Sequence, residues 1–262
     1  MNTVQVTTGR ASERERQRDM NDSGRRRALP EIVVGYVAVS AVLIGIGMFL
    51  THVIEHSALM AWDVRVIRDL SLHRTAGLIH WSSRWSFMAD APSIVAVGAA
   101  VALVCAVRRR WLFVLWIAAV LALELGVFLT VSYTVGRARP EVAHLGSVPS
   151  TGSFPSGHIA ATIALYGTIA LLVRLITRNR LARGLAWIWA VIAAAMVGWA
   201  RMYRGMHHPL DVAAGALLGA AICVVGWRAF GRPGTTLKST VRVEDNQSNP
   251  HGFNSYESKE HR

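Results

Sequence analysis

The uncharged stretch IVVGYVAVSAVLIGIGMFLT, residues Ile32–Thr51, decides the fold class of this 262-residue chain. The hydrocarbon core of a bilayer is about 30 Å thick, and a helix needs about 17–25 mostly apolar residues to cross it. Ile32–Thr51 has this length and therefore predicts a membrane-spanning helix. A cleaved signal peptide, the alternative, would have a shorter apolar region of about 7–15 residues and a small-residue cleavage site. The length favours a retained anchor.

Five further apolar runs follow, and together with the first they predict an all-α bundle with six transmembrane spans. The runs are Ala91–Val107, Trp111–Tyr133, Gly157–Val173, Gly184–Ala200 and Leu210–Trp227. Glu124 interrupts the third span; we interpret it as a neutral, hydrogen-bonded bundle residue, with pairing to a motif arginine as the alternative. The last three runs are near the lower length limit, so we expect their helices to extend into flanking residues that line a cavity in the protein.

Polar ends flank the membrane domain that we expect over residues 31–230. Residues 1–30 are rich in Arg, Glu, Asp and Ser, and residues 231–262 in Gly, Pro, Ser and Asn. Such segments cannot bury enough apolar surface to offset the lost chain entropy, so we expect both to be disordered. The two cysteines, Cys105 and Cys223, fall inside apolar segments and are interpreted as small core residues.

The distribution of basic residues predicts the orientation of the bundle, because cytoplasmic loops carry an excess of Lys and Arg. With a cytoplasmic N-terminus, the inner segments hold 20 of the 28 basic residues and the outer segments hold eight. We therefore expect a multi-pass plasma-membrane protein with both termini in the cytoplasm. The net charge of +12 does not indicate a nucleic-acid partner, because most basic residues lie between apolar runs rather than on one face.

The segment between the first two spans has apolar residues at helical spacing, such as Val64, Ile67 and Leu70. It also holds several charged residues and tryptophans. We expect amphipathic helices that lie on the outer membrane interface. They would roof a site or guide a lipid substrate; a purely structural cover is the alternative.

Three polar motifs lie at the predicted outer ends of the last four spans. They are GRARP at 136–140, FPSGH at 154–158 and RMYRGMHHPLD at 201–211. Ionisable residues at membrane edges are costly and indicate function. The charged and titratable residues of these motifs are Arg and His with one Asp, and this set suits an anionic ligand.

The arginines and the start of the fourth span have the properties of a phosphate site. Arg139 and Arg201 each offer a planar guanidinium that stays charged and binds oxygen pairs. Ser156 and Gly157 precede the fourth span, so their amides would point out of a helix N-terminus toward an anion. Phosphoryl transfer needs such donors, because charge is spread over the equatorial oxygens in the transition state.

His207, Asp211 and His158 have the properties of the reactive groups. His207 and Asp211 are four residues apart, so on one helix they would share a face. Asp211 would hold one imidazole nitrogen as N–H and leave the other lone pair of His207 free to attack phosphorus. His158 would protonate the leaving oxygen and later activate water. His208 is interpreted as a residue of the helix start.

A metal site is the alternative use of these side chains. The histidines of the second and third motifs, with Asp211, are possible ligands of a divalent ion. The motif arginines close by would repel a cation, so the sequence favours an anion site. We therefore expect no metal and no other cofactor.

The three motifs resemble the signature blocks of the type 2 phosphatidic acid phosphatase superfamily. That pattern is Lys, six residues, Arg-Pro; then Pro-Ser-Gly-His; then Ser-Arg, five residues, His, three residues, Asp. The matching residues here are Arg139-Pro140, Pro155 to His158, Arg201, His207 and Asp211. The resemblance covers roughly residues 60–227 and implies a six-span bundle with an extracytoplasmic site.

The resemblance also implies roles for individual residues. His207 would be the nucleophile, Asp211 its partner and His158 the acid. Phosphate would be bound, without a metal, by Arg139, Ser156, Gly157 and Arg201. The expected activity of residues 31–230 is hydrolysis of a lipid phosphate through a phosphohistidine intermediate.

Two positions depart from the family pattern: Ser132 replaces its Lys and Ala200 replaces its Ser. Loss of the Ser removes one neutral hydrogen bond, worth about 0.5–1.5 kcal/mol. Loss of the Lys removes a charged phosphate contact and is more serious. We hypothesise that Arg137 or Arg204 supplies this charge; for Arg204, a lipid-headgroup anchor is the equal alternative. The replacements at positions 132 and 200 are also compatible with lower activity or with a substrate that carries a different headgroup.

The substrate expected first is a polyprenyl diphosphate, followed by phosphatidic acid and phosphatidylglycerophosphate. An embedded bundle favours a lipid, because the substrate would arrive laterally. Phosphotransfer to an acceptor hydroxyl would begin with the same half-reaction and stays open. A non-catalytic anion carrier or lipid-binding protein is the remaining alternative, and the intact reactive residues argue against it. The expected partners are the lipid substrate and membrane lipids, and the sequence indicates no oligomeric state.

Overall fold

The computed structural model describes residues 28–231, and within them it contains helices and no strand. Residues 1–27 and 232–262 lie outside the described residues, so the disordered tails at 1–30 and 231–262 stay predictions. The first helix spans Ala28–Val53 and ends in the π-helical turn η1, Phe49–Val53. The others are α2 Ala58–Leu72, α3 Ala76–Met88, α4 Ala91–Val107, α5 Trp111–Val135, α6 Gly157–Ile176, α7 Arg180–Tyr203 and α8 Pro209–Phe230.

Among the described residues, five helices are long and apolar enough to cross a membrane: the first helix, α5, α6, α7 and α8. The helices α3 and α4 meet at a bend of 49° and together form a sixth candidate span. The prediction of an all-α, six-span membrane protein is confirmed in this form. The predicted second span has the bounds of α4, and α7 and α8 extend into the third motif as expected.

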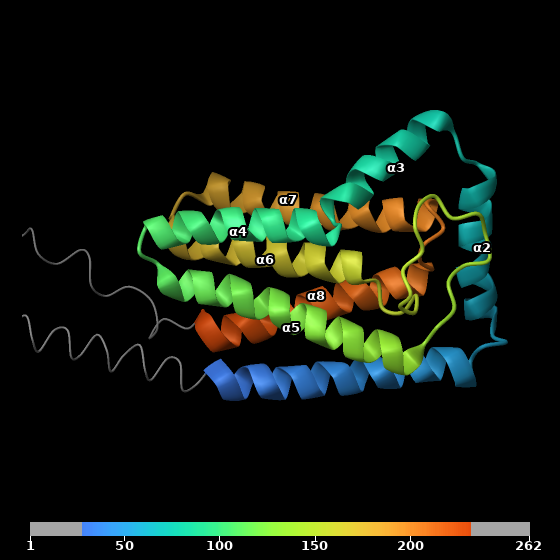
Figure 1. The fold of residues 1–262 in the computed structure, drawn as a ribbon, viewed down its shortest axis with the longest axis horizontal. Coiled ribbons are helices and arrows are strands. Elements are labelled where there is room, and N and C mark those ends of the chain that lie inside the picture. Colours follow the sequence, from blue (N-terminus) through green and yellow to red (C-terminus); the bar gives the residue numbers. More distant parts are fainter. Residues whose placement is uncertain (1–27, 232–262) are drawn as a thin grey trace, which may run out of the picture.

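The long helices run side by side, and α6 packs against α4, α5, α7 and α8 (Figure 1). Small residues allow this packing, because Ala160, Ala164 and Ala170 of α6 are fully buried. The backbones of α6 and α8 approach closely: a Cβ added to Gly219 would lie 2.7 Å from the carbonyl oxygen of Ala160. This contact holds the first turn of α6, which carries the second motif, against the N-terminal half of α8, which begins in the third motif.

Helix α2 lies across one end of the bundle, and α3 slants from there toward α4 (Figure 1). The hydroxyls of Ser57 and Thr75 accept hydrogen bonds from the amides of Met60 and Leu78, and these caps begin the two helices. Helix α2 contacts α7 and α8, and α3 packs on α7. The predicted helices between the first two spans are therefore present.

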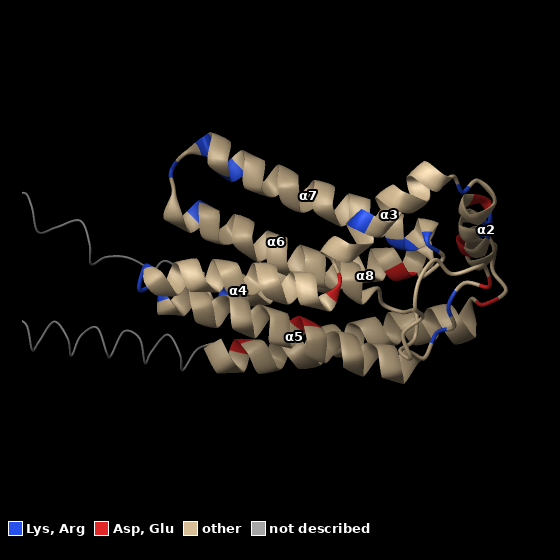
Figure 2. Cartoon of the chain, turned by 45° about the horizontal axis from the view of Figure 1, so that its top comes forward, with Lys and Arg blue, Asp and Glu red and all other residues tan. Residues whose placement is uncertain are grey.

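The two described ends of the chain lie together at the end of the bundle opposite α2 (Figure 1). A surface ion pair joins them there, with Arg228 Nε 3.0 Å from Glu31 Oε2. At the α2 end, acidic and basic residues of several elements gather near the motif loops (Figure 2). The chain is an integral membrane protein with its polar motifs at a single end of the bundle.

Candidate active site

Arg139, in the first motif, binds the third motif and the loop that precedes the second motif. Helix α5 ends at Gly136, whose φ of 60° is left-handed and turns the chain away from the helix. Arg139 follows in an extended segment and donates from Nη1 to the carbonyl of Met206 at 2.8 Å. Its Nη2 lies 3.3 Å from the carbonyls of both Thr151 and Gly152. The guanidinium is thereby fixed between the third motif and the loop that precedes the second motif.

The second motif is held by backbone contacts to both of the others. Ser153 donates its amide to the carbonyl of Arg137, and the amide of Ser156 donates to the carbonyl of Asp211 at 2.9 Å. Ser156 lies at the N-cap of α6, as expected, but its hydroxyl makes no capping hydrogen bond. The hydroxyl is therefore available to a ligand at the helix N-terminus.

Helix α8 begins within the third motif. His208 is its N-cap, and Pro209 is its first residue. The carboxylate of Asp211 accepts the amide hydrogen of His208 at 2.8 Å and lies 3.3 Å from His208 Nδ1. This reciprocal capping box fixes Asp211, which is fully buried. The interpretation of His208 as a helix-start residue is confirmed.

His207 therefore precedes α8, and the prediction that it shares a helix face with Asp211 is wrong. Its Nδ1 lies 2.8 Å from the carbonyl oxygen of Ser153 and 4.0 Å from Asp211 Oδ2. The capping box and an arginine already occupy the Asp211 carboxylate. Because a carbonyl oxygen only accepts, Nδ1 carries the proton and Nε2 carries the lone pair. Ser153 fixes the tautomer, and Asp211 acts on His207 through its charge.

The surroundings of His207 favour the neutral imidazole that a nucleophile requires. The side chain is almost completely buried. Burial is the main cause that lowers the pKa of His207 well below its usual value, and the positive charges of Arg201 and Arg139 lower it further. The charge of Asp211 opposes them. The same interactions show that both arginines and His158 lie near His207.

Three buried donors of this cluster have no hydrogen-bond partner among the described residues: Arg139 Nε, Arg201 Nε and Ser156 Oγ. Arg201 is anchored by its Nη1, which donates to the hydroxyl of Ser86 on α3 at 2.9 Å. A buried donor without a partner costs about 1–3 kcal/mol, more when it is charged. An anion bound between the arginines and Ser156 would remove this cost.

His158, in the first turn of α6, has a carboxylate partner that lies outside all three motifs. Its Nε2 lies 3.0 Å from Oδ1 of Asp90, at the break between α3 and α4. The imidazole is half-buried, whereas His207 is enclosed. The cluster therefore contains one enclosed histidine and one at its edge.

Arg137 is placed differently from the hypothesis that it supplies the missing positive charge to phosphate. Its Nη1 lies 2.5 Å from Asp211 Oδ1, and its Nη2 lies 2.6 Å from Asp63 Oδ2 on α2. Burial alone would lower the pKa of Arg137, but Asp211 and Asp63 raise it above its usual value. The second oxygen of Asp63 accepts the amide of Leu210 at 2.9 Å. Arg137 thus neutralises two buried carboxylates and ties α2 to the start of α8.

The other unusual positions have structural roles. Arg204 donates to the carbonyl of Leu145 and thereby holds the loop between the first two motifs. Ser132, where the family pattern has Lys, is fully buried and donates to the carbonyl of Gly152 at 3.3 Å. Ala200 is also fully buried. A lysine at position 132 would need space that the loop now occupies.

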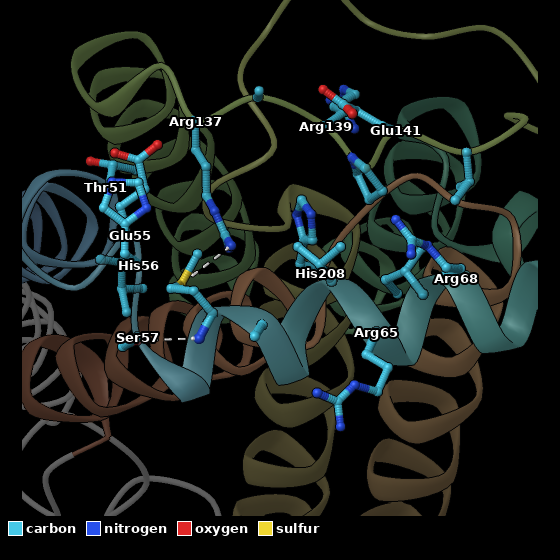
Figure 3. Close-up of a pocket in the computed structure, with 18 of the residues that line it drawn as sticks. Thr51, Glu55, His56, Ser57, Arg65, Arg68, Arg137, Arg139, Glu141 and His208 are labelled. Atoms are coloured by element: carbon cyan, nitrogen blue, oxygen red, sulfur yellow. Dashed lines mark hydrogen bonds between the residues drawn. The ribbon is translucent and has the colours of Figure 1, made fainter.

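Open space reaches the cluster from two sides. A cavity of about 930 Å³ lies between α2 and residues 135–142. Figure 3 shows Arg137, Arg139 and His208 on its wall, with Arg65 and Arg68 of α2 opposite. A second cavity of about 430 Å³ is lined by Ser132, Arg139 and the 148–152 loop. Arg139 borders both, so the cationic side of the cluster is accessible.

Sequence reasoning missed four residues that hold the cluster: Asp63, Ser86, Asp90 and Ser153. Asp63 had a usable signal, because it lies four residues before the buried Ile67 and so on the inward face of α2. Asp90 had a weaker one, since an Asp before Ala-Pro at the start of an apolar run is a typical helix cap. The contacts of Ser86 and Ser153 depend on the tertiary fold alone.

The possible metal ligands are not grouped for metal binding. Within residues 28–231, no group of three or more His, Cys, Asp and Glu side chains is arranged to hold a metal ion. Metal independence stays a prediction.

The sequence model of the PAP2 superfamily matches residues 111–234, which include every motif residue described above. Over this region the chain is similar to the PAP2 superfamily. The chain is 42% identical over 91 residues to the bacitracin transport permease protein BcrC of Bacillus licheniformis, covering 34% of this chain and 40% of that protein. It is 40% identical over 74 residues to an undecaprenyl-diphosphatase of Sulfolobus acidocaldarius, covering 28% and 32%. The match thus spans less than half the length of these two relatives.

A solved structure extends the likeness to the whole bundle. A PAP2-type phosphatidylglycerolphosphate phosphatase from Bacillus subtilis superposes with a TM-score of 0.59 and 23% sequence identity. The superposition covers 76% of this chain and 94% of the other. At this identity the likeness concerns the fold, and it agrees with the helical arrangement of this chain.

Proposed function

We propose that this protein is an integral membrane lipid phosphatase that works through a phosphohistidine at His207. The observation that carries the proposal is the hydrogen bond between His207 Nδ1 and the carbonyl of Ser153. It leaves the Nε2 lone pair free, in a cluster with two buried arginines whose Nε atoms have no partner among the described residues. A neutral imidazole beside unpaired cationic donors suits attack on a phosphate.

The first half-reaction would transfer the phosphoryl group to the protein. The lone pair of His207 Nε2 forms a bond to phosphorus while the bond from phosphorus to the leaving oxygen breaks. Arg139, Arg201 and the hydroxyl of Ser156 stabilise the charge on the equatorial oxygens. His158 gives a proton to the leaving oxygen.

The second half-reaction would release phosphate. A water oxygen forms a bond to phosphorus, His158 takes the proton of that water, and the bond between phosphorus and His207 breaks. Nε2 then regains its lone pair. The carboxylate of Asp211, 4.0 Å from His207 Nδ1, stabilises the positive charge that His207 carries while it is phosphorylated.

The substrate we propose is a lipid phosphate or diphosphate, with a polyprenyl diphosphate first. The undecaprenyl-diphosphatase relative supports this order. Phosphatidic acid and phosphatidylglycerophosphate follow. A phosphotransferase would use the same intermediate and would pass the phosphoryl group to an acceptor hydroxyl instead of water.

The test offers purified protein several lipid phosphates in detergent, without added metal, beside His207→Ala. We expect phosphate release by the wild type and none above background by the variant. Equal release by both would contradict the assignment of the nucleophile. Loss of activity on addition of a chelator would support the metal alternative, and product carrying phosphate on an added alcohol would identify a transferase.

A further inference from the structure

The break between α3 and α4 holds a carboxylate that none of the motifs contains. Asp90 is the N-cap residue of α4, where an Asp side chain commonly accepts a backbone amide of the first turn. It makes no such bond. The second residue of α4 is Pro92, which has no N–H to donate. The side chain of Asp90 is therefore available to a partner outside its own helix.

That partner is His158, whose Nε2 lies 3.0 Å from Asp90 Oδ1. The positive charges of Arg201 and Arg204 lie near Asp90 and favour its ionised carboxylate. An ionised carboxylate only accepts hydrogen bonds. The proton of this bond is therefore on His158 Nε2, and Nδ1 is the nitrogen left for chemistry.

The charges around His158 indicate why a carboxylate is needed there. Arg139, Arg201 and Arg204 place positive charge around the cluster. A proton donor must be an imidazolium before the leaving oxygen departs, and nearby positive charge disfavours that form. Among the described residues, Asp90 is the carboxylate bonded to His158, and its side chain is 44% exposed. The pair lies where the buried cluster meets its surroundings.

We propose that Asp90 is a positioning residue for proton transfer by His158. It holds the Nε2 hydrogen, orients the ring and stabilises the imidazolium. The inference rests on the proposed function. When the leaving oxygen departs from phosphorus, it takes the proton from His158 Nδ1. When water attacks the phosphohistidine, Nδ1 takes a proton from that water, and Asp90 stays a carboxylate throughout.

A purely structural role for Asp90 would be to join the break between α3 and α4 to α6. The two roles differ in how they depend on the leaving group. An alkyl oxygen needs a proton to depart, whereas a nitrophenolate departs without one. A misplaced helix would slow the hydrolysis of both substrates, whereas a misplaced proton would slow only the hydrolysis of the alkyl phosphate.

The experiment compares an alkyl phosphate with a nitrophenyl phosphate that bears the same alkyl tail. General acid–base catalysis contributes about 10²–10⁴-fold, so we expect Asp90→Asn to lower kcat on the alkyl phosphate by about 10–100-fold. The pre-steady-state burst of nitrophenolate, which reports formation of the phosphohistidine alone, should change by less than about threefold. In a His158→Ala background, Asp90→Asn should cause no further loss on the alkyl phosphate.

Three further variants keep the result interpretable. Asp90→Ser places another residue favoured at helix N-caps before α4 but lacks the charge, so it should behave like Asp90→Asn and gives the result where Asp90→Asn folds poorly. Asp90→Glu should recover part of the alkyl activity. Asp69→Asn removes an exposed carboxylate of α2 whose side chain makes no hydrogen bond within residues 28–231, and it should match the wild type.

Equal losses on both substrates, or wild-type rates for Asp90→Ser, would overturn the inference. Additive losses in the His158→Ala background would also overturn it. The proposed function has a separate failure: if His207→Ala gave the same nitrophenolate burst as the wild type, the phosphohistidine itself would be wrong. The two outcomes are measured on different variants and are therefore distinguishable.

Discussion

His207 shows how one backbone carbonyl fixes the chemistry of a side chain. The carbonyl of Ser153 can only accept, so it selects the tautomer with the proton on Nδ1 and the lone pair on Nε2. Asp211, at 4.0 Å, is engaged by the amide of His208 and by Arg137. Orientation and charge, which sequence reasoning assigned together to Asp211, come from two different residues.

The pKa of His207 predicts a particular response to acid. In the proposed mechanism the imidazole attacks when neutral, and its lowered pKa keeps it neutral until the pH falls well below its ordinary value of 6.5. Burial is the main cause and Arg201 the next. Arg201→Gln removes the second cause, so the acid limb of kcat/KM should move to higher pH, whereas Arg201→Lys should leave it near the wild-type position. Ionisation of the substrate is the same for both variants and cancels in the comparison.

Acid limbs at the same pH for Arg201→Gln and Arg201→Lys would contradict this account of His207. The absolute rates do not enter the comparison, because both variants lose the guanidinium fork and should be slower than the wild type.

The motif residues could be placed from the sequence because their spacing within each block is local. Arg139, Arg201 and His158 all lie near His207, as expected. The role of Arg137 could not be foreseen, because it depends on Asp63, which is 74 residues away in the chain. The sequence shows that the family's Lys is absent at position 132 and that an arginine, Arg137, lies two residues before Arg139. This pattern alone does not distinguish a phosphate ligand from a structural ion pair.

At the scale of elements, the Asp63–Arg137–Asp211 ion cluster joins α2 to α8. All three side chains are buried, and removing one partner of a buried ion pair costs about 3–5 kcal/mol. Arg137→Ala should therefore destabilise the fold by about this amount, because it leaves two buried carboxylates without a cation. Thermal unfolding in detergent measures the change.

The exposed pair Arg228–Glu31 provides the matched control. Exposed ion pairs contribute about 0–1 kcal/mol, so Arg228→Ala should leave the melting temperature nearly unchanged. If Arg137→Ala raised KM for the lipid phosphate with unchanged stability, the hypothesis of a direct phosphate contact would be favoured over the structural role.

The contact between α6 and α8 aligns the second and third motifs. A Cβ on Gly219 would lie 2.7 Å from both the carbonyl oxygen of Ala160 and Ile163 Cβ, so the helices would have to separate. Gly219→Val should cost about 1–3 kcal/mol of stability through overpacking and should also lower kcat. Gly45→Ala, where nothing lies within 4 Å, is the control and should be neutral or slightly stabilising. Full activity in Gly219→Val would show that this contact does not align the motifs.

The sequence predicted the helices more readily than the way in which they are joined and the residues at which they begin. Uncharged length predicts a span, and Ala91–Val107 matches α4 residue for residue. The sequence could not show that α4 is joined to α3 through a bend of 49°, because Asp90 before Ala91-Pro92 is typical of the N-cap of any helix. It also could not show that α8 starts after His207, since Pro209 is compatible with several positions in a first turn.

At the scale of the molecule, the bundle has one end with the chain termini of the described part and one end with the motifs (Figure 1). The excess of basic residues at the first end predicts that it is cytoplasmic. A cysteine introduced at Gly152, in the loop beside Arg139, should then react with a membrane-impermeant reagent in intact cells. A cysteine at Arg178, between α6 and α7, should react only after permeabilisation.

The reverse labelling pattern would contradict the predicted orientation and place the motif end in the cytoplasm. Native Cys105 is buried and Cys223 is partly buried, both within helices, so background labelling should be low.

The central claim is a covalent bond between phosphorus and His207. The direct measurement is to quench turnover of a ³²P-labelled lipid phosphate in base, digest the protein and locate the label. The account predicts an acid-labile label on the peptide that contains His207, absent in His207→Ala, with a yield that does not depend on added metal. Label on another residue, or phosphate release by His207→Ala at the wild-type rate, would contradict it.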